Sequence, residues 1–241
     1  FTLGTIAALC TNATGSAWTP TALASLVAWF DPSDLSTMFQ DAAGTTPVTA
    51  AGQPVGLILD KSGNGYHASQ ATSTARPVLE DVGGKMCLKF EVDDYLVCNS
   101  ITLPQPYTVF AGAHVLATNS CIHYSPGVAG SICQIIVPFG NAIDMYAGNH
   151  LLGGPAIGFD NPVVLALVYD GASAYNRKNG VLNASGDVGS GAITGSYVIG
   201  SDGSAFLNWK IYQFVIGAAT YDAATVIEAE TWVADKTGVT L

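Results

Sequence analysis

Forty-nine consecutive residues, from Tyr95 to Ile143, carry no Lys, Arg, Asp or Glu. A transmembrane helix would need about 18 or more consecutive apolar residues. This run does not supply them, because Pro, Gly, Asn, Ser and Gln interrupt it repeatedly. Its most apolar piece, Val109–Ala117, has the length of a strand and contains His114. The run therefore predicts several sheet strands with their loops, and we expect no membrane insertion.

The same bias extends over the whole chain of 241 residues, of which 11% are charged and 49% are hydrophobic. An ordinary soluble domain has roughly 25% charged residues. The apolar content excludes a disordered chain, and the net charge of −10 excludes a general nucleic-acid-binding surface. We expect a surface so poor in charge to be covered in part by other subunits, which predicts a homo-oligomer.

Short apolar runs alternate with turn signals along most of the chain. The runs are rich in Val, Ile, Tyr and Phe, which is typical of an all-β sandwich or barrel. Asn179-Gly180 predicts a hairpin between Ala174–Arg177 and Val181–Asn183, because a type I′ turn needs two residues that tolerate positive φ. The other expected strands are Val55–Leu59, Met86–Phe90, Tyr107–Leu116, Ile132–Val137, Val163–Tyr169, Ser196–Ile199 and Trp209–Ile216.

Two segments carry helical signals. Thr19-Pro20 has the form of an N-cap followed by Pro at the first helical position, and predicts a short helix that continues through Val27. The second segment, Tyr221–Lys236, places its apolar side chains mostly on one stripe and is followed by Gly238, as at a helix C-terminus. We expect this helix on the outside of the sandwich. The chain shows no linker and no repeat, which predicts an arm at residues 1–16 and one domain at 17–241.

Four stretches together carry a family resemblance. They are Leu26-Val-Ala-Trp-Phe-Asp-Pro-Ser-Asp with the following Phe39–Val48, then Asp60-Lys-Ser-Gly-Asn-Gly-Tyr-His-Ala, then Leu88-Lys-Phe-Glu-Val-Asp-Asp-Tyr-Leu, and lastly the region from Val168-Tyr-Asp-Gly to the final helix. In order and spacing they resemble the laminin-G-like jelly rolls of the concanavalin A-like lectin/glucanase superfamily, in the version found in tailed-bacteriophage structural proteins. The resemblance covers about residues 20–240 and departs at Glu91-Val92, where the family more often has Asp-Gly. It implies two curved antiparallel sheets packed face to face, and it implies no particular activity.

Glycosidase chemistry needs two carboxyl groups on either side of one bond. Alternation along a strand puts Glu91 and Asp93 on one face. Laminarinase-like relatives carry a third carboxylate on the same strand, and here Leu96 and Val97 occupy the positions that follow. The sequence therefore favours a protein that is not an enzyme, with Asp93 and Asp94 stabilising a turn.

The remaining nucleophilic and metal-binding signals are weak. Gly-x-Ser-x-Gly is absent, and the four histidines lack zinc spacing, so His67, His114, His123 and His150 are interpreted as surface or half-buried residues. Cysteines stand at positions 10, 87, 98, 121 and 133 without a CxxC pair. They are either two hairpin pairs, Cys87/Cys98 and Cys121/Cys133, or five thiols of a reducing cytosol, and we favour the thiols.

The segment Asp60-Lys-Ser62-Gly-Asn64-Gly65 has two interpretations. It matches the opening of a calcium loop, with oxygen ligands at positions 1, 3 and 5 and Gly at 6, and Asp93 or Asp94 would complete the site. Position 12 is Ala71, however, so the bidentate Glu is missing. The alternative is a turn in which the Asp60 side chain caps backbone N–H groups. We favour the turn, and calcium is the only cofactor that the sequence suggests.

Sugar recognition combines aromatic faces with neutral hydrogen-bonding side chains. The expected loop residues of this kind are Tyr66, Tyr124, Tyr146 and Asn149.

With the family resemblance these residues predict a virion protein of a tailed phage, assembled in the bacterial cytoplasm, that attaches to a host-surface glycan from a tail fibre or tail tip. Two alternatives are a capsid decoration or head-fibre protein and a polysaccharide-degrading enzyme. Residues 1–16 would dock onto other virion proteins by adding a strand to a sheet edge.

Overall fold

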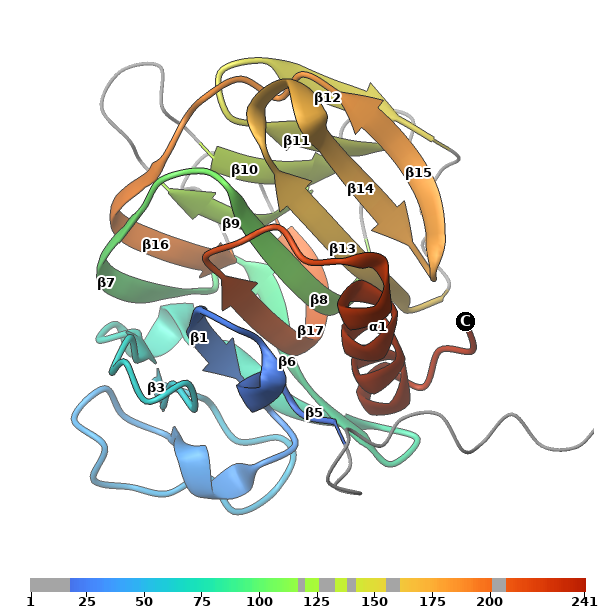
Figure 1. Cartoon of the computed structure of the whole chain (residues 1–241). Helices are drawn as coiled ribbons and strands as arrows, with labels where there is room; N and C mark the ends of the chain where they lie inside the picture. Colours follow the sequence, from blue (N-terminus) through green and yellow to red (C-terminus); the bar gives the residue numbers. More distant parts are fainter. Residues whose placement is uncertain (1–17, 117–119, 126–132, 138–141, 155–160, 201–206) are drawn as a thin grey trace, which may run out of the picture.

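A computed structural model describes residues 18–116, 120–125, 133–137, 142–154, 161–200 and 207–241. They form two antiparallel sheets packed face to face, followed by one α-helix (Figure 1). The prediction of an all-β, jelly-roll-like sandwich with a C-terminal helix is confirmed. The expected arm at residues 1–16 lies outside the described residues, so the proposed domain boundary stays a prediction.

The eight-stranded sheet has the order β15-β14-β13-β8-β17-β6-β5, and β1 pairs with β17 beside β6. Asn179 and Gly180 have φ of 48° and 77° and join β14 to β15, so the predicted hairpin is confirmed. The strands of this sheet are β1 (Leu26–Phe30), β5 (Val78–Val82), β6 (Lys85–Val92), β8 (Tyr107–Val115), β13 (Val163–Tyr169), β14 (Ala174–Lys178), β15 (Val181–Gly186) and β17 (Leu207–Gly217).

The nine-stranded sheet has the order β12-β11-β10-β9-β16-β7-β4-β3-β2. Most of the charge-free run lies here, in strands β7, β9 and β10, and β8 carries the rest into the other sheet. The strands are β2 (Met38–Phe39), β3 (Leu57–Ile58), β4 (Ala68–Ser69), β7 (Tyr95–Leu103), β9 (Ser120–Ser125), β10 (Cys133–Val137), β11 (Ile143–Tyr146), β12 (His150–Gly153) and β16 (Ile193–Gly200).

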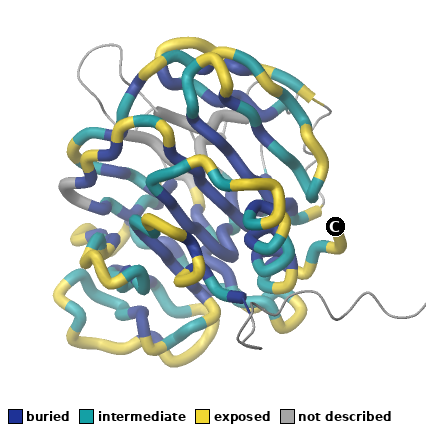
Figure 2. Tube along the Cα trace, viewed as in Figure 1, coloured by how far each residue is buried: buried dark blue, intermediate teal, exposed yellow. Residues whose placement is uncertain are grey.

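One continuous core fills the space between the sheets, where the trace in Figure 2 is coloured as buried. Both sheets contribute aromatic side chains that are almost fully buried, such as Tyr107 and Trp209 from one sheet and Tyr197 from the other. The Tyr107 and Tyr169 rings stack with their centroids 4.6 Å apart. The strands of both sheets therefore bury one face here.

Helix α1 (Ala223–Thr237) covers the outer face of the eight-stranded sheet, against β8, β13 and β17. The Asp222 side chain caps its start by accepting a hydrogen bond from the Thr225 N–H, and Gly238 ends it in the left-handed conformation. Gly112 of β8 permits the close approach, because a Cβ there would lie 2.1 Å from Thr237 Oγ1. The predicted position of this helix outside the sandwich is confirmed.

The predicted N-terminal helix is wrong beyond its first turn. Pro20–Ala22 forms a single 3₁₀ turn, and Leu26 and Val27 belong to strand β1, which pairs with β17. Ala28 and Phe30 lie in the core between the sheets, whereas Trp29 between them lies in the cluster under α1. Both faces of this segment are therefore buried, and its backbone forms hydrogen bonds with β17. Together these outweigh the local helix signal of Thr19-Pro20.

Cys87 and Cys98 are free, buried thiols on different sheets, so they do not form the pair considered from the sequence. Burial raises the pKa of each thiol to about 12. The Cys98 thiol donates to the Tyr66 carbonyl oxygen at 2.9 Å. Cys10 and the side chains of Cys121 and Cys133 lie outside the described part of the chain. No helix within the described residues has the length and apolar character needed to cross a membrane.

Candidate functional site

The outer face of the nine-stranded sheet differs from that of its neighbour because no α-helix in the described part of the chain packs on it. Alternation along β11 shows which side chains this face presents. Ile143 and Met145 lie in the core, so Asp144 and Tyr146 belong to the outer face. The candidate site is built from side chains of this face around Asp144.

One register row crosses much of this face. Tyr146 lies opposite His150 on β12 and opposite Gln134 on β10, and Gln134 lies opposite Tyr124 on β9. The row continues from Tyr124 to Val198 on β16. Tyr124 and Tyr146, predicted as sugar contacts in loops, therefore lie on strands instead. They are two strands apart, or roughly 10 Å at the spacing of a sheet. The Tyr124 side chain lies outside the described set, so only its register position is given.

Asp144, Tyr146 and His150 form a cluster on the β11–β12 hairpin. The Asp144 Oδ2 lies 2.7 Å from Nδ1 of His150, and the imidazole of His150 lies 4.6 Å from the Tyr146 ring, centroid to centroid. The side chain of Asp144 is 5% exposed and that of His150 is 55% exposed. A buried carboxylate thus fixes the orientation of an imidazole that is open to solvent.

The Asp144 carboxylate is only half satisfied. Burial raises its pKa above the ordinary value, although the hydrogen bond with His150 and the charge of that residue act in the opposite direction. Its other oxygen, Oδ1, is buried and receives no hydrogen bond from any described residue. A buried acceptor without a donor costs about 1–3 kcal/mol, so this site gains from any group that donates a hydrogen bond to it.

Asn149 lies at the tip of the same hairpin, between Tyr146 and His150, and is exposed. Its Nδ2 donates to Oδ2 of Asp187 at 2.9 Å, and its backbone N–H donates to the Val188 carbonyl oxygen. The structure therefore brings Tyr146 and Asn149 together, as their proposed common role requires. It adds Asp144, His150 and Asp187, which the sequence analysis did not select as contacts.

Tyr66 lies far from this cluster. It precedes β4, which is five strands from β11, or about 24 Å along the sheet. Its side chain is half-buried against the core, and its backbone N–H donates to Asp60 Oδ2 at 3.0 Å. The four predicted sugar contacts thus do not form one site, because Tyr66 belongs to the Asp60 loop.

The Asp60 carboxylate is used within its own loop. Oδ1 accepts from the backbone N–H groups of Trp29 and Ser62 at 2.9 and 2.8 Å, and Oδ2 accepts from the Ser62 hydroxyl at 2.7 Å. Asn64 Nδ2 donates to the carbonyl oxygens of Leu26 and Val27. These contacts are the caps that the turn interpretation requires, and they attach the loop to β1. Among the described residues no three His, Cys, Asp or Glu side chains gather into a metal site.

Glu91 lies near the end of β6, and Asp93 and Asp94 form the turn between β6 and β7. Asp94 Oδ2 accepts a hydrogen bond from the Glu91 N–H at 2.9 Å, and burial raises the pKa of Asp94. Glu91 is 58% exposed and pairs with Lys89. Asp94 therefore stabilises the turn, and the structure gives no contact that links Asp93 or Asp94 with Asp60.

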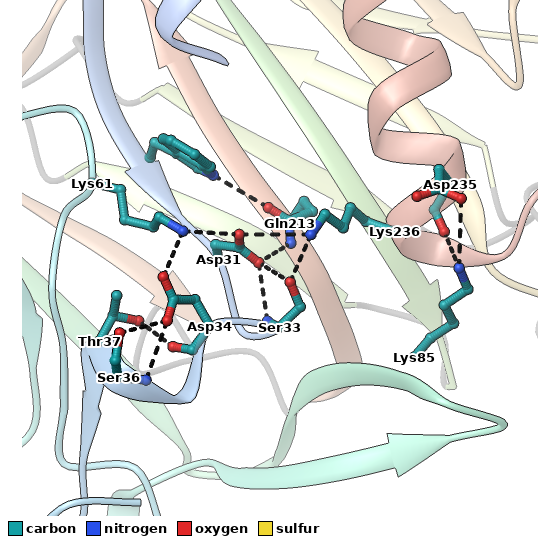
Figure 3. A network of polar contacts seen from close by, with 11 residues as sticks. Asp31, Ser33, Asp34, Ser36, Thr37, Lys61, Lys85, Gln213, Asp235 and Lys236 are labelled. Carbon is teal, nitrogen blue, oxygen red and sulfur yellow. Dashed lines mark hydrogen bonds and ion pairs between the residues drawn. The ribbon is translucent and has the colours of Figure 1, made fainter. Parts of the chain in front are cut away.

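Another buried aspartate, Asp31, directly follows β1 and lies within reach of Lys236 on α1 (Figure 3). Its Oδ1 accepts from Gln213 Nε2 at 2.6 Å and from Ser33, and its Oδ2 lies 3.2 Å from Lys61 Nζ and 3.9 Å from Lys236 Nζ. Burial alone would raise the pKa of Asp31, but these hydrogen bonds and the two ammonium groups lower it. Every oxygen has a partner, so this network joins β1, β17 and α1 and offers no vacant acceptor.

Solved structures with a similar fold include enzymes and a binding domain. Trypanosoma rangeli sialidase matches with a TM-score of 0.55 and 13% identity, over 98% of this chain and 37% of that chain. The binding domain of Paraclostridial Mosquitocidal Protein 1 matches with a TM-score of 0.60 and 11% identity, over 90% of this chain and 53% of that one. Botulinum neurotoxin type C matches with a TM-score of 0.55 and 12% identity, over 87% of this chain and 51% of that one.

These likenesses define a class of fold, the two-sheet sandwich that serves both enzymes and binding domains. The chain spans about half or less of the solved chains named above. No protein-family model matches it, and no curated protein matches it in sequence.

Proposed function

We propose that this chain is a glycan-binding β-sandwich domain without catalytic activity, and that its site is the β11–β12 hairpin on the outer face of the nine-stranded sheet. The observation that carries the proposal is the Asp144–His150–Tyr146 cluster. It combines an aromatic ring, an oriented imidazole and a buried carboxylate oxygen without a donor on a face that no described helix covers. Sugars offer both an apolar ring face and hydroxyl donors, which match these groups.

The structural neighbours support this class of ligand by analogy. The neurotoxin structure concerns interaction with two ganglioside molecules, and the mosquitocidal protein structure is that of a binding domain. The sialidase and an arabinofuranosidase in complex with a sugar share the same kind of fold. Because the sequence identities are low, this chain shares only the fold with these proteins. The proposal of a glycan ligand is therefore based on the residues of this chain.

A glycan array tests the proposal directly. We expect the wild-type domain to bind a subset of glycans and Tyr146→Ala to bind them about tenfold more weakly, because the aromatic face is lost. Thr102→Ala is the matched control, since Thr102 is exposed on β7 of the same sheet and outside the cluster. Absence of binding to any glycan by the folded domain would overturn the proposal.

We also propose that the domain belongs to a virion protein of a tailed phage and serves host attachment from a tail fibre or tail tip. The family resemblance of residues 20–240 supports it, together with a surface low in charge that suits packing among subunits. A handful of copies in purified particles is the expected result. Hundreds of copies would favour the capsid decoration or head-fibre alternative, and absence from particles would contradict both.

The enzymatic alternative has its own test. We expect no reducing ends or unsaturated products when the domain is incubated with host capsule or lipopolysaccharide. Depolymerisation that is lost in Glu91→Ala or Asp93→Ala would replace binding with catalysis. Since Glu91 pairs with Lys89, and Asp94 caps the same turn, we expect these substitutions to affect the turn alone.

A further inference from the structure

The charges around the β11–β12 hairpin restrict which glycan it can accept. We infer that the ligand is a neutral, hydroxyl-rich sugar, and that acidic sugars such as sialic acid are excluded. The inference rests on the proposed glycan-binding function and adds the class of sugar. The inferred exclusion of sialic acid is not what the structural neighbours suggest, because a sialidase is among them.

The first observation is that this sheet has no fixed cation. The chain contains no Lys or Arg between Lys89 and Arg177, and none lies on any strand of the nine-stranded sheet. The strands of the other sheet carry Lys85, Lys89, Arg177, Lys178 and Lys210. Recognition of a carboxylate normally uses Arg or Lys in a charge-assisted hydrogen bond, and this face has neither to offer.

The second observation is that the basic residues elsewhere already have partners. Acidic side chains hold Lys61, Lys85, Lys89, Arg177, Lys210 and Lys236 in ion pairs. Arg76 donates to three backbone carbonyl oxygens, one of them that of Gln70. Lys178 is on β14 of the other sheet. An anion bound on the nine-stranded sheet would therefore find no Lys or Arg on its strands, and six of the cations elsewhere are already held in ion pairs.

The third observation is that the hairpin holds acidic acceptors, one of them a buried oxygen that lacks a donor among the described residues. Asp144 on β11 has the buried oxygen Oδ1 without a donor, and Asp187 lies beside Asn149 at the hairpin tip. Hydroxyl groups donate to carboxylates, so a neutral sugar supplies what Asp144 lacks. A sugar carboxylate would instead add a like charge to two aspartates, which is unfavourable in a partly buried place. His150 is the single titratable base in the cluster, and Asp144 is its positioning residue.

An array of matched oligosaccharides tests the inference, with each chain present both with and without terminal sialic acid. We expect the neutral member of each bound pair to be favoured at least tenfold. A preference for the sialylated members would overturn the inference and leave the proposed function intact. Failure to bind either member would instead overturn the proposed function, so the two outcomes are distinguishable.

Two variants examine the physical cause. Leu152 is 55% exposed on β12 and lies opposite Asp144, so Leu152→Arg adds a cation at the hairpin. We expect the preference for neutral glycans to fall about tenfold in this variant. Leu182→Arg is the matched control, because Leu182 is 58% exposed on β15 of the other sheet. An equal change in both variants, or no change in either, would contradict the proposed role of local charge.

Asp144→Asn removes the carboxylate charge and keeps the shape of the side chain. We expect weaker binding of neutral glycans, by about tenfold, together with a smaller discrimination against sialylated ones. Asp93→Asn makes the same change of charge at an exposed position of the β6–β7 turn and should leave both unchanged. Circular dichroism and the melting temperature establish that each variant is folded. Unaltered binding and discrimination by a folded Asp144→Asn variant would refute the assignment.

Discussion

Asp31 and Asp144 are both buried aspartates, and each lies next to a basic side chain. They differ in how many of their oxygens accept hydrogen bonds. Asp31 has partners for both oxygens, from Ser33, Gln213 and two lysines. Asp144 has only His150, and its second oxygen has no donor among the described residues. Asp31, whose oxygens all have partners, attaches β1 and β17 to α1. Asp144 keeps a buried oxygen without a donor, on a face that no described helix covers.

The largest expected effect is on the free energy of unfolding when Asp31, whose oxygens both have partners, is replaced. Asp31→Ala leaves Lys61, Lys236 and Gln213 without their shared acceptor, and we expect a loss of about 3 kcal/mol in the free energy of unfolding. Urea unfolding measures it. Asp34→Ala is the comparison, because Asp34 is 35% exposed, makes an ion pair with Lys61, and caps the turn at Ser36. Its loss should stay at about 1 kcal/mol. Equal losses would show that the network does not attach the helix through Asp31.

The covered face should also resist added volume. Gly112→Val places atoms where Thr237 and Val233 of α1 already lie, so we expect a loss of about 2 kcal/mol. Thr102→Ile, on the open face of the nine-stranded sheet, should change stability by less than about 0.5 kcal/mol. Thermal or urea unfolding of both variants tests whether one outer face is packed and the other is free.

Glycan binding should depend on the Asp144–His150 cluster and not on the Asp31 network. We expect His150→Ala to weaken glycan binding about tenfold, roughly 1.4 kcal/mol. We also expect a loss of about 1–3 kcal/mol in the free energy of unfolding, because the buried Asp144 carboxylate loses its hydrogen bond with His150. Isothermal titration with a glycan identified on the array measures the affinity. Asp31→Asn should leave that affinity unchanged wherever the variant is folded, and an equal effect of both variants would remove the distinction between the two aspartates.

The smallest expected effect is a pair of opposite pH dependences. The pKa of Asp31 is lowered by folding, so its stabilising contribution is present above the ordinary value of 3.8 and is lost as pH falls through the folded pKa. The pKa of Asp144 is raised, so its contribution is present below 3.8 and is lost as pH rises through the folded pKa.

Unfolding measurements from about pH 3 to pH 7 on wild type, Asp31→Asn and Asp144→Asn test these signs. On acidification the advantage of wild type over Asp31→Asn should shrink, while its stability relative to Asp144→Asn should rise. The same sign for both differences would contradict the assigned environments.

The sequence predicted the fold where local signals and burial agree. Asn179-Gly180 specified its hairpin, and Lys236 with Gly238 marked the end of α1. The Thr19-Pro20 signal failed after one turn because β1 pairs with β17. These strands are far apart in the chain, since the hydrogen-bonded residues Trp29 and Gln213 are separated by 184 positions. No local pattern reports a partner at that distance along the chain.

The site was predicted only in part, and for a related reason. Tyr146 and Asn149 were selected as sugar contacts, whereas His150 was interpreted as an isolated histidine. Asp144 is the residue that ends the charge-free run, and it alternates with the apolar Ile143 and Met145. That alternation was the available signal for an outward acid beside Tyr146. The pairing of Tyr146 with His150 depends on the register of the hairpin, which becomes visible only in the folded sheet.

The distribution of lysine over the two sheets has a practical consequence for handling the protein. Reagents that attach to lysine amines would hold the molecule by the eight-stranded sheet and its surroundings, since the strands of the other sheet contain no lysine. A sensor chip prepared in this way would present the β11–β12 hairpin to the solution. Trypsin, which cuts after Lys and Arg, would likewise release residues 90–177 as one long peptide that contains the hairpin intact.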